Sequence, residues 1–396
     1  MPRGKRVALV GGVGGGNTGN EVSLDVVRDL LRAARDDLRF CVVTPMPVET
    51  TTRGLAHPGE PVLPLRAPRS TAGPRTVGAV LRRALAEGRH TCRVVHEVGG
   101  MRALVVCGTG VLDDFEEPPW GMPWSLLLWA AVARVRRRPF ILLSVGAGPI
   151  GGRVSGRLFR ATAALATEVT YRDADSLRTM VDLGSVRADA RVTCDLAFGR
   201  EVAPGPAAAP GPGMRVAVAV MDWGGWSGDD EEARGQYLAT LTEAVVGVLD
   251  RGHRVVLLVG QPVDVGPAHE VRRSVLSRRP DADLRVADIG AFDDVVDEIL
   301  GADLVVATRF HLVVAALVSA RPVISIGYAP KNRALLTRVG LAHVDRPAEE
   351  VTAAWILEQV DAVARDGARY RGSDEVIEGW RRLVRDEVAA LATRIG

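Results

Sequence analysis

Lysine, cysteine and long apolar runs are all scarce in this chain of 396 residues. Only two of its 50 basic residues are lysines, Lys5 and Lys331, so nearly all positive charge is carried by arginine. Basic residues exceed acidic ones by 50 − 48 = +2. A net charge so close to zero gives no electrostatic reason to expect binding to nucleic acid or to an anionic membrane surface.

The few cysteines argue against a disulfide-stabilised domain and against a zinc-binding domain. They are Cys41, Cys92, Cys107 and Cys194, and none forms a CxxC pair. Four scattered cysteines make no disulfide framework in a chain of this length. A zinc site needs clustered ligands at short spacing, and the sequence has none. We therefore expect neither a bound metal nor a cofactor.

Segments that would take the chain into or through a membrane are also lacking. Val7–Val10 are the only apolar residues between the basic start and a glycine, too few for the core of a signal peptide. The longest apolar stretch, Leu126–Val135, is interrupted by Arg134 and is far shorter than a membrane span. We expect a cytoplasmic protein, and peripheral contact with a membrane stays open.

Short apolar runs rich in β-branched residues recur and indicate buried strands. They are Val7–Val10, Phe40–Val43, Leu104–Cys107, Phe140–Val145, Glu168–Tyr171, Val216–Met221, Val255–Val259, Leu304–Ala307 and Val323–Ile326. Most are continuous rather than alternating, which is typical of parallel strands buried on both faces. Helical patterns such as Val22–Ala34 separate them, so the sequence predicts an α/β fold.

A proline- and glycine-rich segment divides these patterns into two sets. Residues Glu201–Gly213 read EVAPGPAAAPGPG, which suits neither a helix nor a central strand. The sequence thus predicts α/β domains over residues 1–200 and 214–375, joined by a linker over 201–213. A helical pattern over Asp374–Ile395 makes residues 376–396 a terminal helix that we expect to cross back to the first domain.

Two doubly wound, Rossmann-like domains facing a cleft would bind ligands beyond the carboxyl ends of their strands. The proline-rich segment Pro58–Arg75 predicts an irregular surface loop. The three tryptophans within Trp120–Trp129 fit either a wall on which a sugar stacks or the hydrophobic core.

The glycine-rich loop Gly11–Glu21 follows the first strand and precedes a helix. Its glycines allow close backbone approach, and the helix start offers free N–H groups to an anion. A dinucleotide site is disfavoured because no acidic residue follows the second strand, and a P-loop is excluded because no GK[ST] follows. The alternative is a plain glycine turn with Asn20 as the helix cap.

Polar residues follow several other strands. CGTGVLDD and SVGAGP are strand-to-glycine transitions, and Arg172 in YRDADS is suited to bind a carboxylate or phosphate. The alternative for Arg172 is an ion pair with Asp173, which would also cap the next helix. Asp195 fits the polar end of a strand.

The segment Asp303–Lys331 is the most informative. A strand runs into Thr308-Arg309-Phe310-His311, and a helix of small and apolar residues follows. A second strand then leads to Tyr328 and Lys331. A lone histidine at such a helix start is usually a core residue, but an arginine beside it at the helix start favours an anion site.

These segments, in this order, resemble the polysaccharide pyruvyl transferase family. The resemblance rests on GNTGNE, CGTGVLDDF, SVGAGPI, YRDADSLRTMVDLG, CDLAF and ATRFHLVVAALVSARPVISIGYAPK, the last being the most specific. It covers most of residues 1–340. It implies a two-domain fold similar to GT-B glycosyltransferases, with the acceptor on the side of the first domain and the donor on the side of the second.

Characterised members of the family transfer a pyruvyl group from phosphoenolpyruvate to a sugar and form a cyclic ketal, and the resemblance implies the same reaction here, without a metal. It implies that Arg172 and Arg309 hold the carboxylate and phosphate of the donor, together with Lys331 and Tyr328. It also implies that His311 gives a proton to the methylene carbon, a role worth roughly 10²–10⁴-fold in rate.

The acceptor side is predicted to include Asn17, Asn20, Glu21 and Asp113. Many members carry aspartate where this chain has Asn20. An amide cannot act as a base, so Glu21 or Asp113 would have to serve instead.

Two other functions remain as alternatives. A GT-B-like glycosyltransferase would need a carboxylate that grips the ribose of a nucleotide-sugar, for which Asp264 and Asp288 are candidates. A non-catalytic relative would have lost the donor residues, yet Arg172, Arg309 and His311 are all present. A Rossmann oxidoreductase is disfavoured by the missing acidic residue after the second strand.

Overall fold

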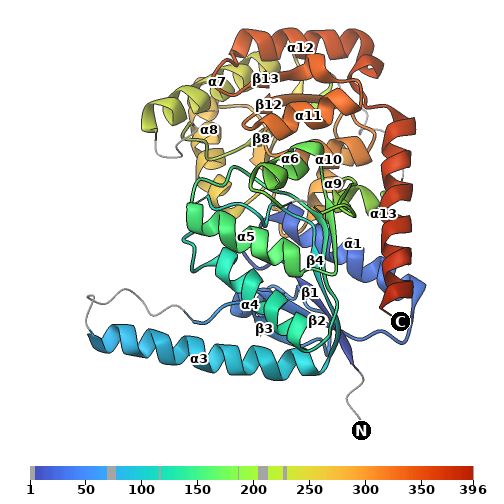
Figure 1. The fold of residues 1–396 in the computed structure, drawn as a ribbon. Coiled ribbons are helices and arrows are strands. Elements are labelled where there is room, and N and C mark those ends of the chain that lie inside the picture. The colour runs from blue at the N-terminus through green and yellow to red at the C-terminus, as the bar shows by residue number, and fades with distance from the viewer. Residues whose placement is uncertain are drawn as a thin grey trace. The chain divides into compact units, whose positions relative to one another are not determined.

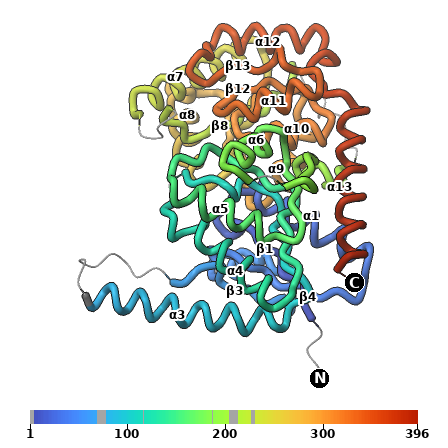
Figure 2. The backbone as a smooth tube through the Cα atoms, viewed as in Figure 1, coloured from blue at the N-terminus to red at the C-terminus, as the bar shows by residue number. Residues whose placement is uncertain are grey.

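The fold was analysed in a computed structural model that describes residues 5–68, 77–115, 117–185, 187–203, 213–225 and 230–395. The chain forms two compact units (Figures 1 and 2). The first comprises Met1–Gly15, Asn20–Gly199 and Arg382–Gly396, and the second comprises Gly16–Gly19 and Arg200–Arg381. Most of the predicted linker over 201–213, from 204 to 212, lies outside the described residues.

The first unit contains a seven-stranded parallel sheet in the order β3-β2-β1-β4-β5-β6-β7. Its strands are β1 (Arg6–Val10), β2 (Phe40–Thr44), β3 (Val62–Pro64), β4 (Met101–Cys107), β5 (Phe140–Val145), β6 (Glu168–Tyr171) and β7 (Arg191–Val192). Its helices are α1 (Thr18–Ala34), α2 (Pro47–Thr52), α3 (Val77–Gly99), α4 (Met122–Val135), α5 (Arg153–Leu165) and α6 (Ala174–Asp182), with a 3₁₀ turn η1 (Leu196–Gly199). The strand order reverses between β1 and β4, which makes the sheet doubly wound.

The second unit repeats this plan with six parallel strands in the order β10-β9-β8-β11-β12-β13. They are β8 (Arg215–Val220), β9 (Arg254–Val259), β10 (Leu284–Val286), β11 (Leu304–Ala307), β12 (Val323–Gly327) and β13 (Asp345–Pro347). The helices are α7 (Glu231–Asp250), α8 (Val265–Arg278), α9 (Phe292–Leu300), α10 (Phe310–Val318), α11 (Pro330–Arg338), α12 (Ala353–Asp366) and α13 (Asp374–Arg394). Short 3₁₀ turns are η2 (Pro262–Asp264), η3 (Ala342–Val344) and η4 (Gly367–Tyr370).

All nine predicted strands are present, but the structure adds four. These are β3, β7, β10 and β13, each two or three residues long and each at the edge of its sheet. Strand β3 lies inside Pro58–Arg75, so the prediction of an irregular loop is wrong for Val62–Pro64. Residues 69–76 lie outside the described part of the chain.

Helix α13 begins in the second unit, and its residues from Arg382 onward belong to the first. Within the first unit, Val388 and Leu391 are fully buried. Glu387 pairs with Arg191 of β7 at 2.5 Å. A terminal helix that crosses back to the first domain is what the sequence predicts.

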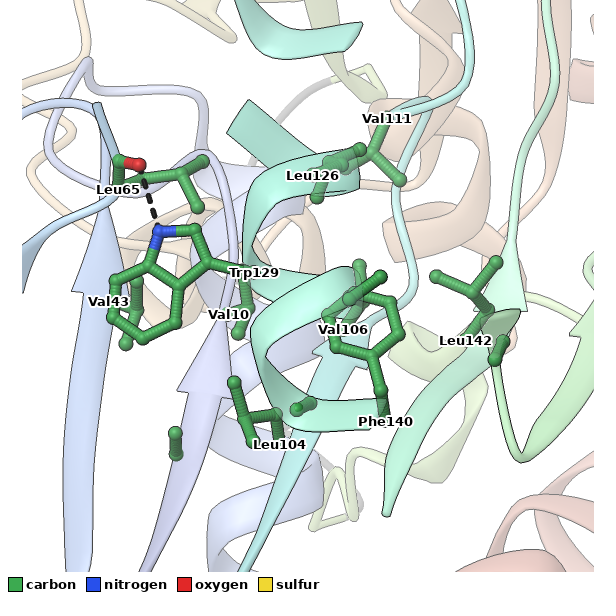
Figure 3. Packing of buried hydrophobic residues seen from close by; sticks show 14 of the residues in the cluster. Val10, Val43, Leu65, Leu104, Val106, Val111, Leu126, Trp129, Phe140 and Leu142 are labelled. Atoms are coloured by element: carbon green, nitrogen blue, oxygen red, sulfur yellow. Dashed lines mark hydrogen bonds between the residues drawn. The ribbon is translucent and has the colours of Figure 1, made fainter. Parts of the chain in front are cut away.

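The core of the first unit lies between its sheet and helices such as α4 (Figure 3). Trp129 packs there with Phe140 and Leu104, and only 1% of its surface is exposed. Its indole N–H donates to the Leu65 carbonyl at 2.8 Å, so its polar atom is satisfied. Trp129 is therefore a core residue, whereas Trp120 is 62% exposed.

Candidate active site

In the second unit, strand β11 runs directly into helix α10, and Arg309 is the residue before the helix. Thr308 between them is fully buried, with its hydroxyl 3.3 Å from the Ala219 carbonyl and 3.0 Å from the Tyr237 hydroxyl. The Asn332 amide donates to the Thr308 carbonyl at 2.9 Å. These buried bonds fix the backbone from which Arg309 projects.

The guanidinium of Arg309 is bound by Asp264 of η2. Nη2 lies 2.6 Å from Oδ1 and Nε lies 2.9 Å from Oδ2, which is the two-point geometry of a strong arginine–carboxylate pair. Asp264 is fully buried, and its oxygens also accept the backbone N–H groups of Asp222 at 2.9 Å and Gly260 at 3.3 Å. The carboxylate thus fixes the orientation of Arg309.

This pairing leaves a defined part of Arg309 for a ligand. A guanidinium has five N–H groups, and Asp264 takes Nε–H and one on Nη2. Three remain, on Nη1 and Nη2, and they can bind an anion from the far side. Asp264, by contrast, already accepts four hydrogen bonds and has no lone pair left to grip a ribose. This geometry does not support Asp264 as the candidate ribose ligand of the glycosyltransferase alternative.

His311 is the second residue of α10. Its ring lies edge-on to Phe310, with 5.2 Å between the ring centroids. Residues Gly16–Gly19 belong to the same compact unit, and Gly19 lies against the imidazole. A Cβ atom at Gly19 would stand 1.9 Å from Nδ1 of His311, so only glycine fits there.

Lys331, at the start of α11, also lies beside the beginning of α10. Its ammonium is 4.9 Å from the centroid of the Tyr328 ring and 5.7 Å from that of Phe310. Both distances are within the range of a cation–π interaction. Tyr328 and Lys331 are half-buried. The structure therefore places Arg309, His311, Tyr328 and Lys331 at the carboxyl ends of β11 and β12, with the Arg309 guanidinium directed toward Asp264 after β9.

In the first unit, Arg172 follows strand β6 and is only 8% exposed. Its Nε lies 3.1 Å from Asp173 and its Nη1 lies 3.5 Å from Asp195. The backbone at Gly146 approaches closely, since a Cβ there would be 2.9 Å from Nη2. Like Arg309, Arg172 is an arginine at a strand end whose orientation is set by acidic neighbours.

Asp173 also caps helix α6, because its Oδ1 accepts the backbone N–H of Ser176 at 2.7 Å. Burial acts to raise the pKa of Asp173. The charge of Arg172 and the hydrogen bonds from Ser176 and Arg172 outweigh burial, so the pKa lies below its ordinary value. The ion pair and the cap that the sequence offered as the alternative for Arg172 are thus both present.

Two non-glycine residues in the first unit have left-handed backbone at the carboxyl ends of strands. Thr109 (φ 67°) follows β4 and Ser144 (φ 51°) lies in β5. The Thr109 carbonyl accepts the N–H of Gly146 at 2.6 Å, and the Ser144 hydroxyl lies 2.8 Å from that of Thr193. Such strain costs on the order of 1–3 kcal/mol and gathers at functional sites. It marks the CGTG and SVGAGP segments, next to Arg172.

The glycine loop differs from the prediction at its helix start. Helix α1 begins at Thr18, and Asn17 accepts the N–H of Gly19 at 3.2 Å. Asn20 lies inside the helix and donates to the Gly12 carbonyl at 3.2 Å. The alternative in which Asn20 caps the helix is therefore wrong, because the helix begins at Thr18 and Asn17 stands at the capping position.

The two acidic candidates for the acceptor side differ in their surroundings. Glu21 is buried, and both of its oxygens bind the guanidinium of Arg53. Asp113 is half-buried and lies against Gly148. A Cβ atom added at Gly148 would be 2.7 Å from the Cβ atom of Asp113. The neighbouring Asp114 accepts the N–H groups of residues 151 and 152 at 3.0 and 2.7 Å, which ties its loop to the start of α5.

Sequence reasoning anticipated the pairing of Arg172 with Asp173 but did not connect Asp195 with Arg172 or Asp264 with Arg309. Asp264 stands 45 residues before Arg309 in the chain, and Asp195 stands 23 residues after Arg172. The available signal was topological: β9 and β11 both flank β8, so the turns that follow them emerge at the same edge of the sheet.

Solved structures similar to this chain have the same fold. They include MurG from Acinetobacter baumannii (TM-score 0.55, 12% identity, 98% of this chain and 99% of that one). A putative UDP-N-acetylglucosamine 2-epimerase from Listeria monocytogenes is also similar (TM-score 0.63, 14% identity, 98% and 96%). The spinosyn rhamnosyltransferase SpnG is a third (TM-score 0.53, 16% identity, 98% and 99%). These neighbours confirm the predicted class, with two Rossmann-like α/β domains as in GT-B enzymes.

No curated protein matches the chain significantly in sequence. The model of one family, described as polysaccharide pyruvyl transferase, matches residues 17–330. That range begins in the glycine loop and extends through β11, α10 and β12 to the start of α11. It includes Arg172, Arg309, His311 and Tyr328 and ends one residue before Lys331. The chain therefore belongs to the polysaccharide pyruvyl transferase family.

Proposed function

We propose that this enzyme transfers a pyruvyl group from phosphoenolpyruvate to two hydroxyls of a sugar-like acceptor in the cytoplasm, forming a cyclic ketal. One observation carries the proposal: Arg309, His311 and Lys331 all stand at the carboxyl ends of β11 and β12, around the start of α10. Two fixed cationic side chains and a helix start suit a donor that has both a carboxylate and a phosphate. An imidazole beside them suits proton transfer to that donor.

The reaction begins with a proton. Protonation of the methylene carbon turns it into a methyl group and makes C2 cationic, and the first acceptor hydroxyl then attacks C2. The second hydroxyl displaces phosphate and closes the ketal. Of the two hydroxyl protons released, one replaces the proton given to the methyl group and the other leaves on phosphate. The sum is donor plus diol to ketal plus phosphate, and the balance requires no metal.

Each residue at the α10 start has a part in this scheme. Arg309 offers its three remaining N–H groups to the anionic donor, and Lys331 adds a point charge that suits phosphate. Tyr328 holds the Lys331 ammonium over its ring. His311 is the general acid, and the close packing of Gly19 against its ring limits the positions that the ring can adopt.

Residues of the first unit enter the proposal through the family resemblance. Arg172 is assigned to the donor, and Asn17, Asn20, Glu21 and Asp113 to the acceptor. The base for the acceptor hydroxyl is assigned to Glu21 or Asp113, and Arg53 binds both oxygens of Glu21.

The test is phosphate release from phosphoenolpyruvate with a panel of hexose and glycoside acceptors, with the ketal identified by mass spectrometry. Lys331→Met should weaken donor binding, whereas Arg333→Gln, two residues further along α11 and exposed, should not. A loss of roughly 1.5–3 kcal/mol in binding free energy, or about 10–150-fold in affinity, fits one charge-assisted hydrogen bond. Equal donor affinity in both variants would contradict the assignment of Lys331.

A binding measurement tests the glycosyltransferase alternative. Calorimetric titration with UDP-sugars and with phosphoenolpyruvate should show binding of phosphoenolpyruvate alone. Selective binding of a UDP-sugar, with sugar transfer to the acceptor panel, would overturn the proposed donor.

A further inference from the structure

Helix α3 carries a row of exposed apolar side chains over its first half. Val80, Leu81 and Leu85 are 65%, 60% and 53% exposed. Leu81, Leu85, Gly88 and Cys92 follow the i, i+4, i+7, i+11 spacing that places residues on one helix face. All four are exposed, so this stripe faces away from the unit. In Figure 1, this half of α3 extends past the other helices of the first unit.

A second stripe of the same helix is basic. Arg82, Arg89 and Arg93 each follow a residue of the apolar stripe, and together with Arg83 they are exposed. In the described part of the chain, none of these four arginines forms an ion pair. The helix has two acidic residues, and both have partners on neighbouring elements.

Those two acidic side chains are Glu87 and Glu97. Glu87 accepts the indole N–H of Trp124 at 2.7 Å, and Glu97 pairs with Arg6 at 3.2 Å. Their charges are therefore drawn to the body of the unit, and the outer side of α3 is left with arginine. This local excess exists although the net charge of the whole chain is only +2.

An exposed tryptophan is connected to α3 through Glu87, on the side of the helix away from Leu81 and Leu85. Trp120 is 62% exposed and packs edge-on to Trp124, with 6.0 Å between ring centroids. The indole N–H of Trp124 in turn donates a hydrogen bond to the carboxylate of Glu87 in α3. The apolar and basic stripes of α3 alone are typical of a helix at the interface between a bilayer and water.

We propose that this face of α3, defined by Leu81, Leu85, Arg82 and Arg89, docks on the surface of an anionic phospholipid bilayer. The two leucines would enter the interface while the arginines contact lipid phosphates. No helix in the described part of the chain is long and apolar enough to cross a membrane, so the contact would be peripheral. It would let the enzyme reach an acceptor carried on a lipid.

The charge and the apolar stripe of α3 favour an anionic bilayer over a second copy of the chain or a nucleic acid. A second copy of α3 on the same face would bring arginines against arginines. The two acidic residues of α3 would offset them little, because Glu87 is bound to Trp124 and Glu97 to Arg6. Nucleic acid would match the arginines but would leave the leucines without an apolar partner. An anionic bilayer meets both stripes at once.

The experiment is flotation of the full chain with vesicles, without either substrate, so that its result is independent of the proposed reaction. Vesicles of phosphatidylcholine with about 30% phosphatidylglycerol are compared with phosphatidylcholine alone. Binding is expected only with the anionic vesicles and should weaken between about 0.1 M and 0.5 M salt. A polarity-sensitive dye on Cys92, the exposed cysteine of α3, should report transfer to an apolar environment.

Two double variants test the two stripes. Leu81→Ser/Leu85→Ser and Arg82→Gln/Arg89→Gln should each weaken binding by on the order of tenfold or more. The matched control is Arg178→Gln/Val181→Ser on α6, an exposed arginine and valine of the same unit, and it should bind as the parent does. Melting temperatures equal to that of the parent protein would show that all the variants are folded.

Three outcomes would overturn the proposal. One is absence of binding to anionic vesicles, and another is an equal loss in the α6 control. The third is a concentration-dependent dimer, seen by sedimentation, that the leucine variant dissociates while vesicle binding is absent.

Discussion

The buried carboxylate of Asp264 binds the guanidinium of Arg309 through both of its oxygens, at 2.6 and 2.9 Å. Two backbone N–H groups hold the same carboxylate from behind. The arginine therefore does not have to lose rotamer freedom when a ligand arrives, which is how preorganised sites reduce the entropic cost of binding.

Replacing Asp264 with asparagine should impair the donor site and the fold together. An amide nitrogen would meet either Arg309 or a backbone N–H, donor against donor, and breaking a buried pair costs about 3–5 kcal/mol of unfolding free energy. We expect the KM for the donor to rise by roughly 10–100-fold, with a smaller change in kcat. Steady-state kinetics and urea unfolding measure both quantities. Asp288→Asn, an exposed carboxylate after β10, is the control, and a parent-like KM in Asp264→Asn would disprove the positioning role.

His311→Gln should abolish turnover and spare donor binding. Loss of a general acid lowers kcat by roughly 10²–10⁴-fold, whereas the anion ligands Arg309 and Lys331 remain. Single-turnover phosphate release and calorimetric titration with phosphoenolpyruvate separate the two effects. His343→Gln, whose ring packs on Tyr370 elsewhere in the same unit, should keep full activity. Parent-like turnover in His311→Gln would remove the residue from the chemistry.

Gly19→Ala should lower activity through His311. The new methyl group would overlap the imidazole, at 1.9 to 2.4 Å from three of its atoms, and would force the ring or the loop to move. A displacement of about 1 Å in a catalytic group can cost on the order of 10²-fold in rate. Gly88→Ala in α3 meets no atom within 4 Å and should instead stabilise the helix by roughly 0.5–1 kcal/mol. If Gly19→Ala and Gly88→Ala turn over at the same rate, the packing of Gly19 against His311 does not contribute to the catalytic rate.

Asp173→Asn should change how stability depends on pH. The pKa of Asp173 is lower in the folded protein than in the unfolded chain, so its charge stabilises the fold above the unfolded value of about 3.9. That contribution is lost as the pH falls below this value and through the folded pKa. The variant should therefore be less stable than the parent at pH 7, and the gap should close in acid, because asparagine can still cap α6. Urea unfolding at several pH values measures the gap, and a gap independent of pH would contradict the ion pair with Arg172.

One cysteine should react in the native protein. Cys92 is exposed, whereas Cys41, Cys107 and Cys194 are buried. Burial also raises the pKa of both Cys41 and Cys107 to about 12, so little thiolate forms at neutral pH. Titration with a thiol reagent should give one fast equivalent per chain and four after denaturation. Cys92→Ser should lose the fast equivalent, and a second fast thiol would show that the core opens.

The central strands could be predicted from sequence because burial on both faces leaves continuous runs such as Phe140–Val145. The edge strands could not, since one side of each is unpaired and their residues need not be apolar. Arg191–Val192 of β7 and Asp345–Pro347 of β13 show this, with arginine, aspartate and proline in strand positions. Their identity as strands comes from the neighbour to which they pair, not from their own composition.

The same division holds at the candidate site. Arg309 and His311 could be identified because they stand together at a strand end, within a few residues of one another. The partner of Arg309 could not, because Asp264 reaches it from another strand end of the same sheet. Helix starts were also harder to place than strands, as Asn17 and Asn20 show, because a run of glycine, asparagine and threonine offers several possible caps.

The return of α13 to the first unit sets the order in which the protein is completed on the ribosome. Residues 382–395 bury Val388 and Leu391 in the first unit, and they are translated after all of the second. The first unit is thus completed last, because Arg191 of its edge strand β7 gains its partner Glu387 only when α13 has been translated. Cutting the gene after residue 200 would leave that unit incomplete, whereas a cut that removes only α13 from Arg382 onward would spare the second unit and damage the first.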